Sequence, residues 1–513
     1  MRAAYADLTQ TLGKWHPTTP MTDALSDILH HHFQINGFFQ VQKKAIPEIL
    51  QACRSTQRRT DFCITAPTGS GKTFTYLIPI LLHLHKRIIC RLRALIVVPT
   101  RDLATQVYQI ATALCAATNL KCALITGQAN FGHEQNLLVG DSERHARKHT
   151  SDGHSEIDII IATPGRLVDH LEQTSGFTLQ HLQFLIVDEA DRLLTQSYQD
   201  WIAKVYQSIY STATNASSLH PEDDLLAIQT IRSVNGIQNQ SQIRVPLVRI
   251  LLSATLTENP GKLAAIGMHH ARVLKIKNSD LDQSSQNLTK EPELKHDSNA
   301  GPVYETPEKL EEWLVECDSE SKPLRLVQLL LQFHDQMTLV FTSSVNATHR
   351  LTRLLQLMFK ELNGDDIGVQ EYSSSLTLQQ RRKLVAKCKK GLNRVLVCSD
   401  AMARGMDLDD VVNVINYDVP THIKTYVHRA GRAARAGRYG RCVTLVKRGQ
   451  TKGLQRMLQK TNKKQLLSFS LSPEEMQNLV PIYKKALQNL KETLEMEANG
   501  KLKATAKITQ KRE

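Results

Sequence analysis

Short runs of apolar, largely β-branched residues recur along the chain and alternate with longer segments of helical periodicity. Near-continuous apolar strands between helices are typical of parallel sheets that helices cover on both faces. We therefore predict an α/β fold. The predicted strands are Cys63–Ala66, Ala94–Val98, Ala123–Thr126, Ile157–Ala162, Phe184–Val187, Arg249–Leu252, Thr338–Phe341, Arg394–Cys398, Val411–Asn416 and Arg441–Leu445.

A polar stretch divides these strands into two groups, which predicts two α/β domains. Residues 278–302 are rich in Ser, Asp, Asn, Gln and Lys, a composition typical of a connector. Two other polar, poorly periodic stretches in the first group are expected to be surface insertions. The predicted parts are an N-terminal domain 1–277 with insertions 130–156 and 211–244, a connector 278–322, a C-terminal domain 323–450 and a helical, Lys-rich extension 451–513.

The C-terminal extension contains a helical pattern that would place Leu487, Leu490 and Leu494 on one face. The Lys-rich residues 501–512 that follow could contact RNA or direct localisation. A solvated tail is an equally good interpretation of the same residues.

A glycine-rich loop after the first strand predicts a phosphate-binding site. Backbone N–H groups of such a loop, together with a helix N-terminus, bind phosphate oxygens. Lys72 would place a cation on the β- and γ-phosphates, and the Thr73 hydroxyl would be a ligand for Mg²⁺. The loop consists of Ala66, Pro67, Thr68, Gly69, Ser70, Gly71, Lys72 and Thr73.

An acidic tetrad supplies the second half of this predicted ATP-hydrolysing site. Residues 188–191 read Asp-Glu-Ala-Asp and follow the apolar run Phe184–Val187 directly. Asp188, at the end of a strand, is expected to hold the same Mg²⁺ as Thr73. Glu189 is placed to orient or deprotonate the attacking water.

Charge and composition favour a nucleic-acid partner. The 513 residues are enough for two to four domains, and the formal net charge of +14 suggests a polyanion. Only 5% of the residues are aromatic, which argues against a base-stacking RNA module. No apolar segment approaches the length of a membrane span, so we expect no membrane partner.

Cysteines and histidines give no metal or disulfide signal. The nine cysteines form no Cys-x-x-Cys pair, so neither zinc knuckles nor a disulfide framework is indicated. His30, His31 and His32 have no second ligand cluster at metal spacing, and we interpret them as surface or helix-end residues.

The motifs, in this order and spacing, resemble those of the DEAD-box RNA helicase family. The resemblance extends from Gln42 to beyond Gly437 and implies tandem RecA-like domains, each a mostly parallel sheet covered by helices on both faces. The segments that carry it are residues 66–73, Pro99–Ala104, Thr163–Arg166, Asp188–Asp191, Ser253–Thr255, Leu339–Ser344, Ser399–Asp407 and His428–Gly437.

The resemblance implies further residues for the nucleotide. Gln42 matches the family's adenine-reading glutamine, and Gly405 and Asp407 match the nucleotide contacts of the second domain. Arg432 and Arg435 match arginine fingers that reach the γ-phosphate across the domain cleft. Their spacing of three would place both guanidinium groups on one helical face.

The resemblance also implies an RNA-binding groove and a switch that couples it to ATP. The coupling positions are Asp191, Ser253, Thr255 and His428. The RNA-gripping positions are Thr100, Arg101, Thr163, Gly165 and Arg166 in the first domain and Thr342, Ser399, Asp400 and Arg404 in the second. Helix N-termini, amides and short hydroxyl groups favour phosphates over bases, so sequence-independent binding is expected.

The chain departs from the family pattern at positions that phosphoryl transfer does not need. Leu25 stands where the family has an aromatic residue that stacks on adenine, and Phe33 or Trp15 could substitute for it. The usual Gly-Gly pair is Gly127–Gln128 here. The last motif reads Ala433-Ala434-Arg435, which keeps the arginine.

Some details resemble a nucleolar subgroup that acts on precursors of the large ribosomal subunit. They are the segments Phe39–Gln42, Phe341–Ser344, Thr425–Arg432 and Leu479–Tyr483. The resemblance implies pre-ribosomal RNA and proteins as partners. It also implies a nucleolar location and a chain shorter at its N-terminus than its relatives.

The prediction is an ATP-dependent RNA helicase or RNP remodeller that uses ATP and Mg²⁺. One alternative is an ATP-gated RNA clamp or assembly scaffold with little unwinding. A DNA helicase or translocase is a third interpretation, which the tetrad and the RNA-type motifs disfavour.

Overall fold

The computed structural model describes most of the chain. The described residues are 2–15, 19–54, 60–66, 70–140, 155–194, 200–210, 247–253, 267–268, 271–275, 306–307, 309–363, 368–400, 406, 408, 410–434, 438–459, 461, 467–469 and 472–498. Several predicted positions lie outside them: Pro67, Thr68, Gly69, Thr255, Arg404, Gly405, Asp407, Arg435 and the insertion 211–244.

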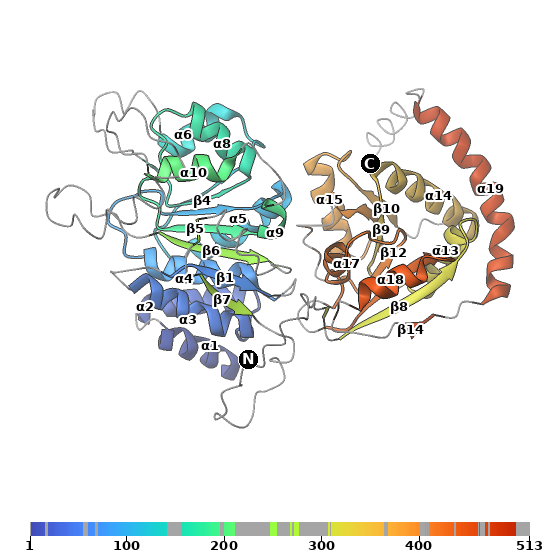
Figure 1. The fold of residues 1–513 in the computed structure, drawn as a ribbon, viewed down its shortest axis with the longest axis horizontal. Helices are drawn as coiled ribbons and strands as arrows, with labels where there is room; N and C mark the ends of the chain where they lie inside the picture. The colour runs from blue at the N-terminus through green and yellow to red at the C-terminus, as the bar shows by residue number, and fades with distance from the viewer. Residues whose placement is uncertain are drawn as a thin grey trace. The chain divides into compact units, whose positions relative to one another are not determined.

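Two compact units make up the chain. Unit 1 reaches to Gln286 and unit 2 begins at Asn287. Each unit is built around one seven-stranded sheet, and all described strand pairs are parallel (Figure 1). The predicted α/β fold with two mostly parallel sheets is confirmed.

The sheet of unit 1 has the strand order β3-β4-β2-β5-β6-β1-β7. Successive residues of a strand point to opposite faces. On β2, for example, Ile96 belongs to one hydrophobic cluster, and Leu95 and Val97 belong to the other. The strands are β1 (Phe62–Thr65), β2 (Ala94–Val97), β3 (Cys122–Ile125), β4 (Ile159–Ala162), β5 (Phe184–Asp188), β6 (Val248–Ser253) and β7 (Arg272–Lys275).

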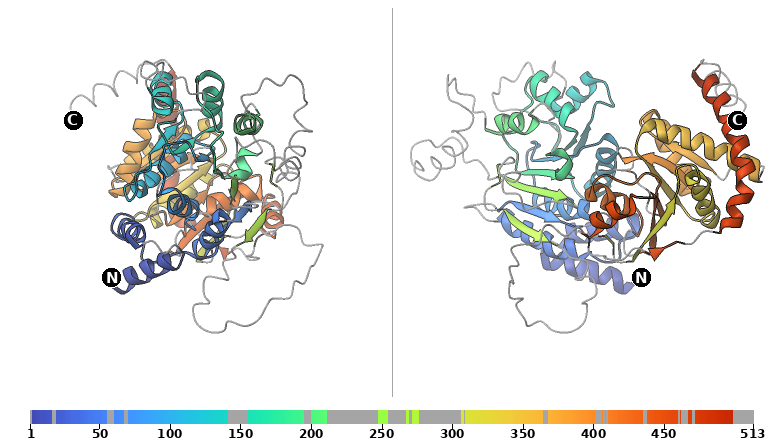
Figure 2. Two further views of the ribbon diagram at one scale, coloured as in Figure 1. Left: turned by 90° about the vertical axis from the view of Figure 1, so that its left-hand side faces the viewer. Right: turned by 45° about the vertical axis from the view of Figure 1, so that its right-hand side comes forward.

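Helices cover both faces of this sheet, as Figures 1 and 2 show. The cluster on one face takes apolar side chains from α1 to α5, and the cluster on the other face takes them from α6, α8, α9 and α10. The helices are α1 (Arg2–Trp15), α2 (Thr19–Asp27), the π-helix η1 (Ile28–His32), α3 (Gln40–Arg54), α4 (Lys72–Leu84), α5 (Arg101–Cys115), α6 (Phe131–Val139), α8 (Pro164–Gln173), α9 (Ala190–Leu193) and α10 (Trp201–Tyr210).

The sheet of unit 2 has the strand order β10-β11-β9-β12-β13-β8-β14. If β8 to β14 are matched in sequence order with β1 to β7, the two sheets have the same topology. The strands are β8 (Leu310–Cys317), β9 (Thr338–Thr342), β10 (Val369–Tyr372), β11 (Val395–Ser399), β12 (Asn413–Asn416), β13 (Gly440–Lys447) and β14 (Leu467–Ser468).

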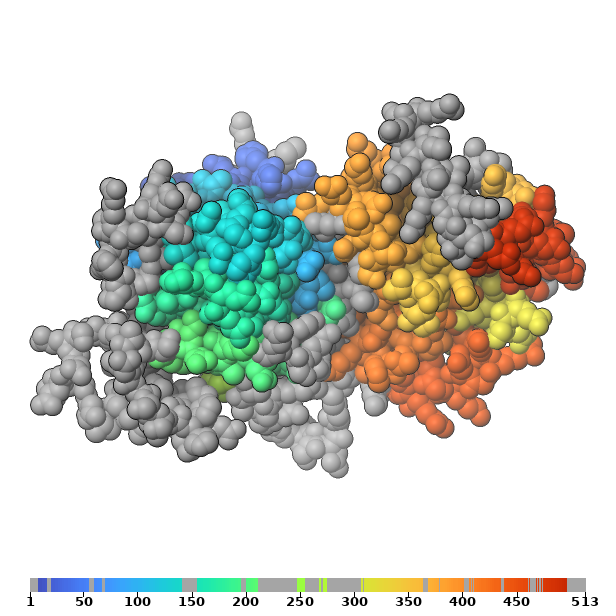
Figure 3. All heavy atoms as spheres, turned by 90° about the horizontal axis from the view of Figure 1, so that it is seen from above, coloured from blue at the N-terminus to red at the C-terminus, as the bar shows by residue number. Residues whose placement is uncertain are grey.

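Helices cover both faces of the second sheet as well. One hydrophobic cluster includes α13, α14 and α19, and the other includes α15, α17 and α18. In Figure 3, α19 is the red segment beside the yellow region that holds α13 and α14. The helices are α13 (Lys322–Gln332), α14 (Val345–Asn363), α15 (Leu378–Lys389), α17 (Ile423–Ala430), α18 (Thr451–Leu458) and α19 (Pro473–Ala498).

The structure corrects two details of the sequence interpretation. Strand β8 lies inside the predicted connector 278–322, so the second sheet begins before that connector ends. Residues 131–139, assigned to a polar insertion, form α6, in which Glu134 and Leu138 are buried. The helix predicted in the extension is present as α19, in which Leu479 and Ala486 are buried, Leu490 packs against the same cluster and Leu487 is exposed.

Candidate functional site

The phosphate loop of unit 1 joins β1 to the N-terminus of α4. Gly71 precedes the helix with φ +77°, a conformation that glycine adopts readily. Lys72 is the first residue of α4, and its Nζ donates a hydrogen bond to the Ala66 carbonyl at 2.9 Å. The predicted phosphate-binding lysine therefore lies against the described ends of the loop.

Gln42 reaches the same loop from α3. Its side chain is only 1% exposed, and its Nε2 donates to the Gly71 carbonyl at 3.0 Å. Its Oε1 accepts the Phe39 N–H at 2.9 Å. A Cβ atom on Gly71 would lie 2.4 Å from Gln42 Nε2, so this contact requires glycine. The amide predicted to read adenine thus borders the phosphate loop.

Asp188, at the end of β5, lies close to Lys72. Burial raises the pKa of Asp188 to about 6, and the positive charge of Lys72 acts in the opposite direction. The Tyr76 hydroxyl donates to Asp188 Oδ2 at 3.3 Å, and the Glu189 N–H donates to Oδ1 at 2.8 Å. Glu189 has φ +49°, so the chain turns sharply after Asp188. The two halves of the predicted ATP site therefore come together.

Ser253, the last residue of β6, connects the tetrad to the strand that carries the phosphate loop. Its Oγ donates to Asp191 Oδ1 at 2.8 Å. Its carbonyl accepts the Ala66 N–H at 3.2 Å. A structural change at the Asp188–Asp191 tetrad can therefore be transmitted to the phosphate loop through Ser253. The fourth predicted coupling residue, His428, lies in α17 of unit 2 and is buried.

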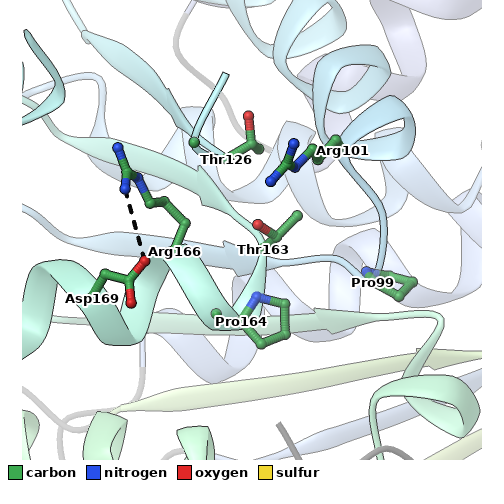
Figure 4. A pocket seen from close by; sticks show the side chains of 9 residues that line it. Pro99, Arg101, Thr126, Thr163, Pro164, Arg166 and Asp169 are labelled. Carbon is green, nitrogen blue, oxygen red and sulfur yellow. Dashed lines mark ion pairs between the residues drawn. The ribbon is translucent and has the colours of Figure 1, made fainter. Parts of the chain in front are cut away.

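A polar pocket of about 350 Å³ lies at the carboxyl ends of β2, β3 and β4 in unit 1. Four of the five RNA positions predicted in unit 1 line it: Arg101, Thr163, Gly165 and Arg166. Arg101 and Arg166 lie on opposite sides of Thr163 in Figure 4. The fifth position, Thr100, caps α5, because its Oγ1 accepts the Leu103 N–H at 3.3 Å. The remaining lining residues are Pro99, Thr126, Gly127, Pro164 and Asp169.

Glu134 is an important neighbour of this pocket that the sequence interpretation missed. Its carboxylate receives hydrogen bonds from Gly127 and Arg166, which line the pocket, and contacts His170. The sequence did contain one signal for Glu134: it is an acidic residue at a helical position whose side chain is buried. It was hidden because the surrounding segment is polar enough to resemble an insertion.

In unit 2, the predicted RNA positions Thr342 and Ser399 are buried, whereas the Asp400 side chain is 37% exposed. The Thr342 side chain is fully buried and its hydroxyl lies 2.7 Å from that of Thr348. Ser399 is 6% exposed. Asp400 makes a bidentate pair with the buried Arg429, with Nε–Oδ1 and Nη2–Oδ2 distances of 2.5 and 2.8 Å. The Thr342 hydroxyl is thus bonded within the protein, and its role toward RNA stays a prediction.

The expected helical face for the arginine fingers is not formed. Helix α17 ends at Ala430, and Arg432 lies in the turn that follows. Ala434 has φ +56°, which breaks the helical path before Arg435. The spacing of three therefore says nothing about a shared face, and the role of both arginines remains an expectation from the resemblance.

Unit 2 has a lysine–aspartate pair at the positions that correspond to Lys72 and Asp188. Lys322 is the first residue of α13, after β8, and Asp418 follows β12. Lys322 Nζ lies 3.2 Å from Asp418 Oδ1, and Asp418 Oδ2 accepts the Ser343 N–H at 2.8 Å. Burial acts to raise the pKa of Asp418, but the Ser343 and Lys322 contacts outweigh it and lower the pKa.

Comparisons with known proteins decide the family. A family model described as DEAD/DEAH box helicase matches residues 39–263, and one described as helicase conserved C-terminal domain matches residues 321–437. The "DEAD-box ATP-dependent RNA helicase 1" of Oryza sativa subsp. japonica is 37% identical, covering 92% of this chain and 86% of its own length. This chain belongs to the DEAD-box helicase family.

Other relatives of this DEAD-box helicase are also named as ATP-dependent RNA helicases. The human "ATP-dependent RNA helicase DDX51" is 37% identical over 90% of this chain, which spans 66% of the human protein. The "ATP-dependent RNA helicase dbp6" of Schizosaccharomyces pombe is 35% identical over 88% of this chain and 73% of its own length. The predicted class, an ATP-dependent RNA helicase with RNA-dependent ATPase activity, is confirmed. The clamp alternative is not favoured.

Solved structures of DEAD-box proteins share the fold. Mss116p bound to single-stranded RNA and AMP-PNP has a TM-score of 0.62 at 23% identity, covering 92% of this chain and 82% of that one. Dbp5 of S. cerevisiae bound to RNA and ADP BeF3 has a TM-score of 0.61 at 18% identity, covering 90% and 97%. Both likenesses support tandem RecA-like domains.

Leu25 is not an adenine-stacking residue in this DEAD-box helicase, since it is fully buried in the core of unit 1. Of the suggested substitutes, Phe33 packs edge-on against Phe74 of α4, and Trp15 packs against Phe38, so their role at adenine stays a prediction. Phe39 is 37% exposed and borders Gly71. Its backbone N–H bonds to Gln42, so Phe39 is an aromatic residue beside the predicted adenine-reading amide.

Two absences hold for the described part of the chain. Its helices include none that is both long and apolar enough to cross a membrane. Its His, Cys, Asp and Glu side chains form no cluster of three or more that could hold a metal ion.

Proposed function

We propose that this DEAD-box helicase couples hydrolysis of Mg²⁺-ATP to local separation of RNA duplexes in precursors of the large ribosomal subunit. The observation that carries the ATPase part is the convergence of Gln42, Lys72 and Asp188 on one loop of unit 1. These residues supply an amide, a cation and a carboxylate, which suit the base, the phosphates and the metal of Mg²⁺-ATP.

The donor set fits Mg²⁺, which prefers oxygen ligands and is commonly held by one or two carboxylates plus substrate phosphates. Asp188 and Thr73 would hold the ion, which when bound would neutralise charge on the phosphates. Burial of Asp188, which raises its pKa to about 6, favours a cation beside it. Glu189 then orients or deprotonates the attacking water, and Lys72 binds the β- and γ-phosphates.

Closure of the two units on ATP and RNA would complete the site. Arg432 and Arg435 would approach the γ-phosphate as arginine fingers, and Gly405 and Asp407 would contact the nucleotide from unit 2. Asp191, Ser253, Thr255 and His428 would couple this closure to the grip on RNA. Because both ligands favour the closed state, each should increase the affinity for the other.

The RNA grip proposed for unit 1 depends on the pocket beside Arg101 and Arg166. Helices α5 and α8 both begin at this pocket, and helix N-termini bind phosphate groups through their backbone N–H groups. These contacts recognise the backbone and not the bases. In unit 2, the RNA backbone would also contact Ser399, Asp400 and Arg404. Thr342 would support these contacts through the hydrogen bond between its hydroxyl and that of Thr348.

The assignment to large-subunit precursors extends the proposal to partners and location. It is supported by the subgroup-like segment Phe39–Gln42, by α19, which packs on unit 2, and by the similarity to DDX51 and dbp6. Pre-ribosomal RNA and proteins would be the partners, and the nucleolus the location. RNA crosslinking in cells followed by sequencing should recover large-subunit precursors; fragments drawn mainly from messenger RNA would contradict this assignment.

Glu189→Gln tests the catalytic part. We expect ATP binding to persist while RNA-stimulated turnover falls by about 10²–10⁴-fold, because general-base catalysis contributes that much. Glu172→Gln, an exposed carboxylate change on α8, is the control and should leave turnover intact. Retained turnover in Glu189→Gln would refute the role of Glu189. Retained cellular function without turnover would favour the RNA clamp.

A further inference from the structure

We propose that Glu134 is a positioning residue for RNA binding, because it holds both Arg166 and the Gly127 turn at the wall of the pocket. The inference depends on the RNA-binding role proposed above for this pocket. It adds a residue that touches no RNA itself and sets the arrangement of the groups that do.

Glu134 lies on α6 and is 1% exposed, yet its carboxylate is well supplied with hydrogen-bond donors. Oε1 accepts the Gly127 N–H at 3.1 Å and the Thr126 N–H at 3.4 Å. Oε2 accepts Arg166 Nε at 2.5 Å and lies 3.1 Å from His170 Nε2. Burial acts to raise the pKa of Glu134, but the bonds from His170 and Arg166 outweigh it and lower the pKa. The carboxylate is therefore ionised.

His170 completes the buried part of this network. Burial lowers its pKa, so the ring is neutral and has one donor and one acceptor nitrogen. Since the Glu134 carboxylate only accepts, His170 Nε2 must donate to it, and Nδ1 accepts from the Thr174 hydroxyl at 2.8 Å. Glu134 is thus fixed by donors from three directions.

Arg166 is held on one edge and on one face. Glu134 receives its Nε–H, and its guanidinium carbon lies 4.5 Å from the centre of the Phe131 ring. The Phe131 ring also stacks on His170, with ring centres 4.4 Å apart. The only ion pair of its terminal nitrogens among the described residues is a 3.8 Å contact with the half-exposed Asp169. Those nitrogens can therefore bind a phosphate.

Gly127 is the second group that Glu134 positions. It has φ +70°, and a Cβ atom there would lie 3.5 Å from Arg166 Cδ and 3.8 Å from Arg101 Nη2. One carboxylate thus fixes the turn after β3 and the arginine of α8 relative to each other. Holding a binding group before the ligand arrives reduces the entropy lost on binding.

A purely structural role for Glu134 makes a different prediction. If the carboxylate only stabilised unit 1, its removal would lower stability and reduce every activity together. If it positions Arg166, its removal should weaken RNA binding alone, and only while Arg166 is present.

Glu134→Gln keeps the shape and removes the charge. We expect the RNA concentration that half-activates the ATPase to rise about tenfold, since charge-assisted bonds are roughly twice as strong as neutral ones. The kcat at saturating RNA and the KM for ATP should stay within about twofold. Glu172→Gln on α8 is the matched control. Phe131→Leu, which removes the ring that contacts Arg166 and His170 but keeps the Glu134 carboxylate, should give a smaller rise of about threefold.

The double variant decides between the two roles. In the Arg166→Ala background, Glu134→Gln should add less than about twofold to the half-activating RNA concentration. A full tenfold effect there, or an equal loss of kcat and thermal stability, would overturn the inference. If Arg166→Ala itself leaves RNA activation unchanged, the RNA role of the pocket fails. If Arg166→Ala weakens RNA activation and Glu134→Gln does not, only the positioning role fails.

Discussion

Gln42→Glu provides a test of the nucleotide site because it changes one atom's chemistry and almost no volume. In the native protein Gln42 Nε2 donates to the Gly71 carbonyl at 3.0 Å. In the variant, an ionised carboxylate oxygen would face the Gly71 carbonyl oxygen, so two hydrogen-bond acceptors would lie together without a donor. Only its protonated form could restore the donor.

The buried position sets the magnitude. Burying this charge beside an unpaired carbonyl should destabilise unit 1 by about 3 kcal/mol at pH 8. At 1.36 kcal/mol per pH unit, that corresponds to a folded-state pKa for the new carboxyl about two units above its usual value near 4.3. A raised folded-state pKa means that stability is complete below the unfolded-state pKa and is lost as pH rises through the folded-state value. At pH 5 the loss should therefore shrink to about 1 kcal/mol.

Urea denaturation at pH 5 and pH 8 measures this difference, with Gln51→Glu on the exposed side of α3 as control. The control should change stability by less than about 0.5 kcal/mol at either pH. At pH 8 the preference for ATP over GTP should also fall about tenfold, since a bidentate amide–adenine contact contributes about 1–3 kcal/mol of discrimination. Equal destabilisation at both pH values, or an unchanged ATP preference, would show that Gln42 does not hold the loop and read the base.

Two further predictions concern unit 1. Ser253→Ala removes the 2.8 Å hydrogen bond to Asp191 but keeps the backbone hydrogen bond from Ala66. Strand displacement should therefore fall at least about tenfold, while RNA-stimulated ATPase activity stays within about threefold of the native value. A parallel loss of both activities would contradict the coupling role of Ser253. A hydrogen bond from Cys115 lowers the pKa of Cys122, whereas burial raises that of Cys90 to about 11, so iodoacetamide at pH 7.5 should modify Cys122 well before Cys90, as peptide mass spectrometry would show.

The sequence predicted the strands that are continuously apolar and missed those that are not. Every strand with a run such as Ile159–Ala162 was found, since strands buried on both faces are mostly apolar. β8 escaped because Leu310–Cys317 mixes apolar and acidic residues without strict alternation and lies next to a polar stretch. Its neighbour β13 buries it in the sheet, a contact between residues more than a hundred positions apart that local pattern does not reveal.

The candidate site divides in the same way. Lys72 and Asp188 were found because a phosphate loop and an acidic strand end have recognisable local sequences. Glu134 has no such sequence: its importance comes from Arg166 and His170, which lie more than thirty residues away. Likewise, the helix predicted through Arg432 already ends at Ala430, and at Ala434 the backbone turns to positive φ although alanine favours helices.

The equivalent strand orders of the two sheets make the Lys322–Asp418 pair informative. In unit 2 the lysine at the start of the corresponding helix already has a carboxylate as its counter-ion, and the cation also lies 4.5 Å from the centre of the Tyr417 ring. A triphosphate that bound there would have to displace Asp418, a residue of the same chain that stays close to Lys322. The duplicated architecture should thus bind one nucleotide per molecule, and each catalytic cycle should consume a single ATP.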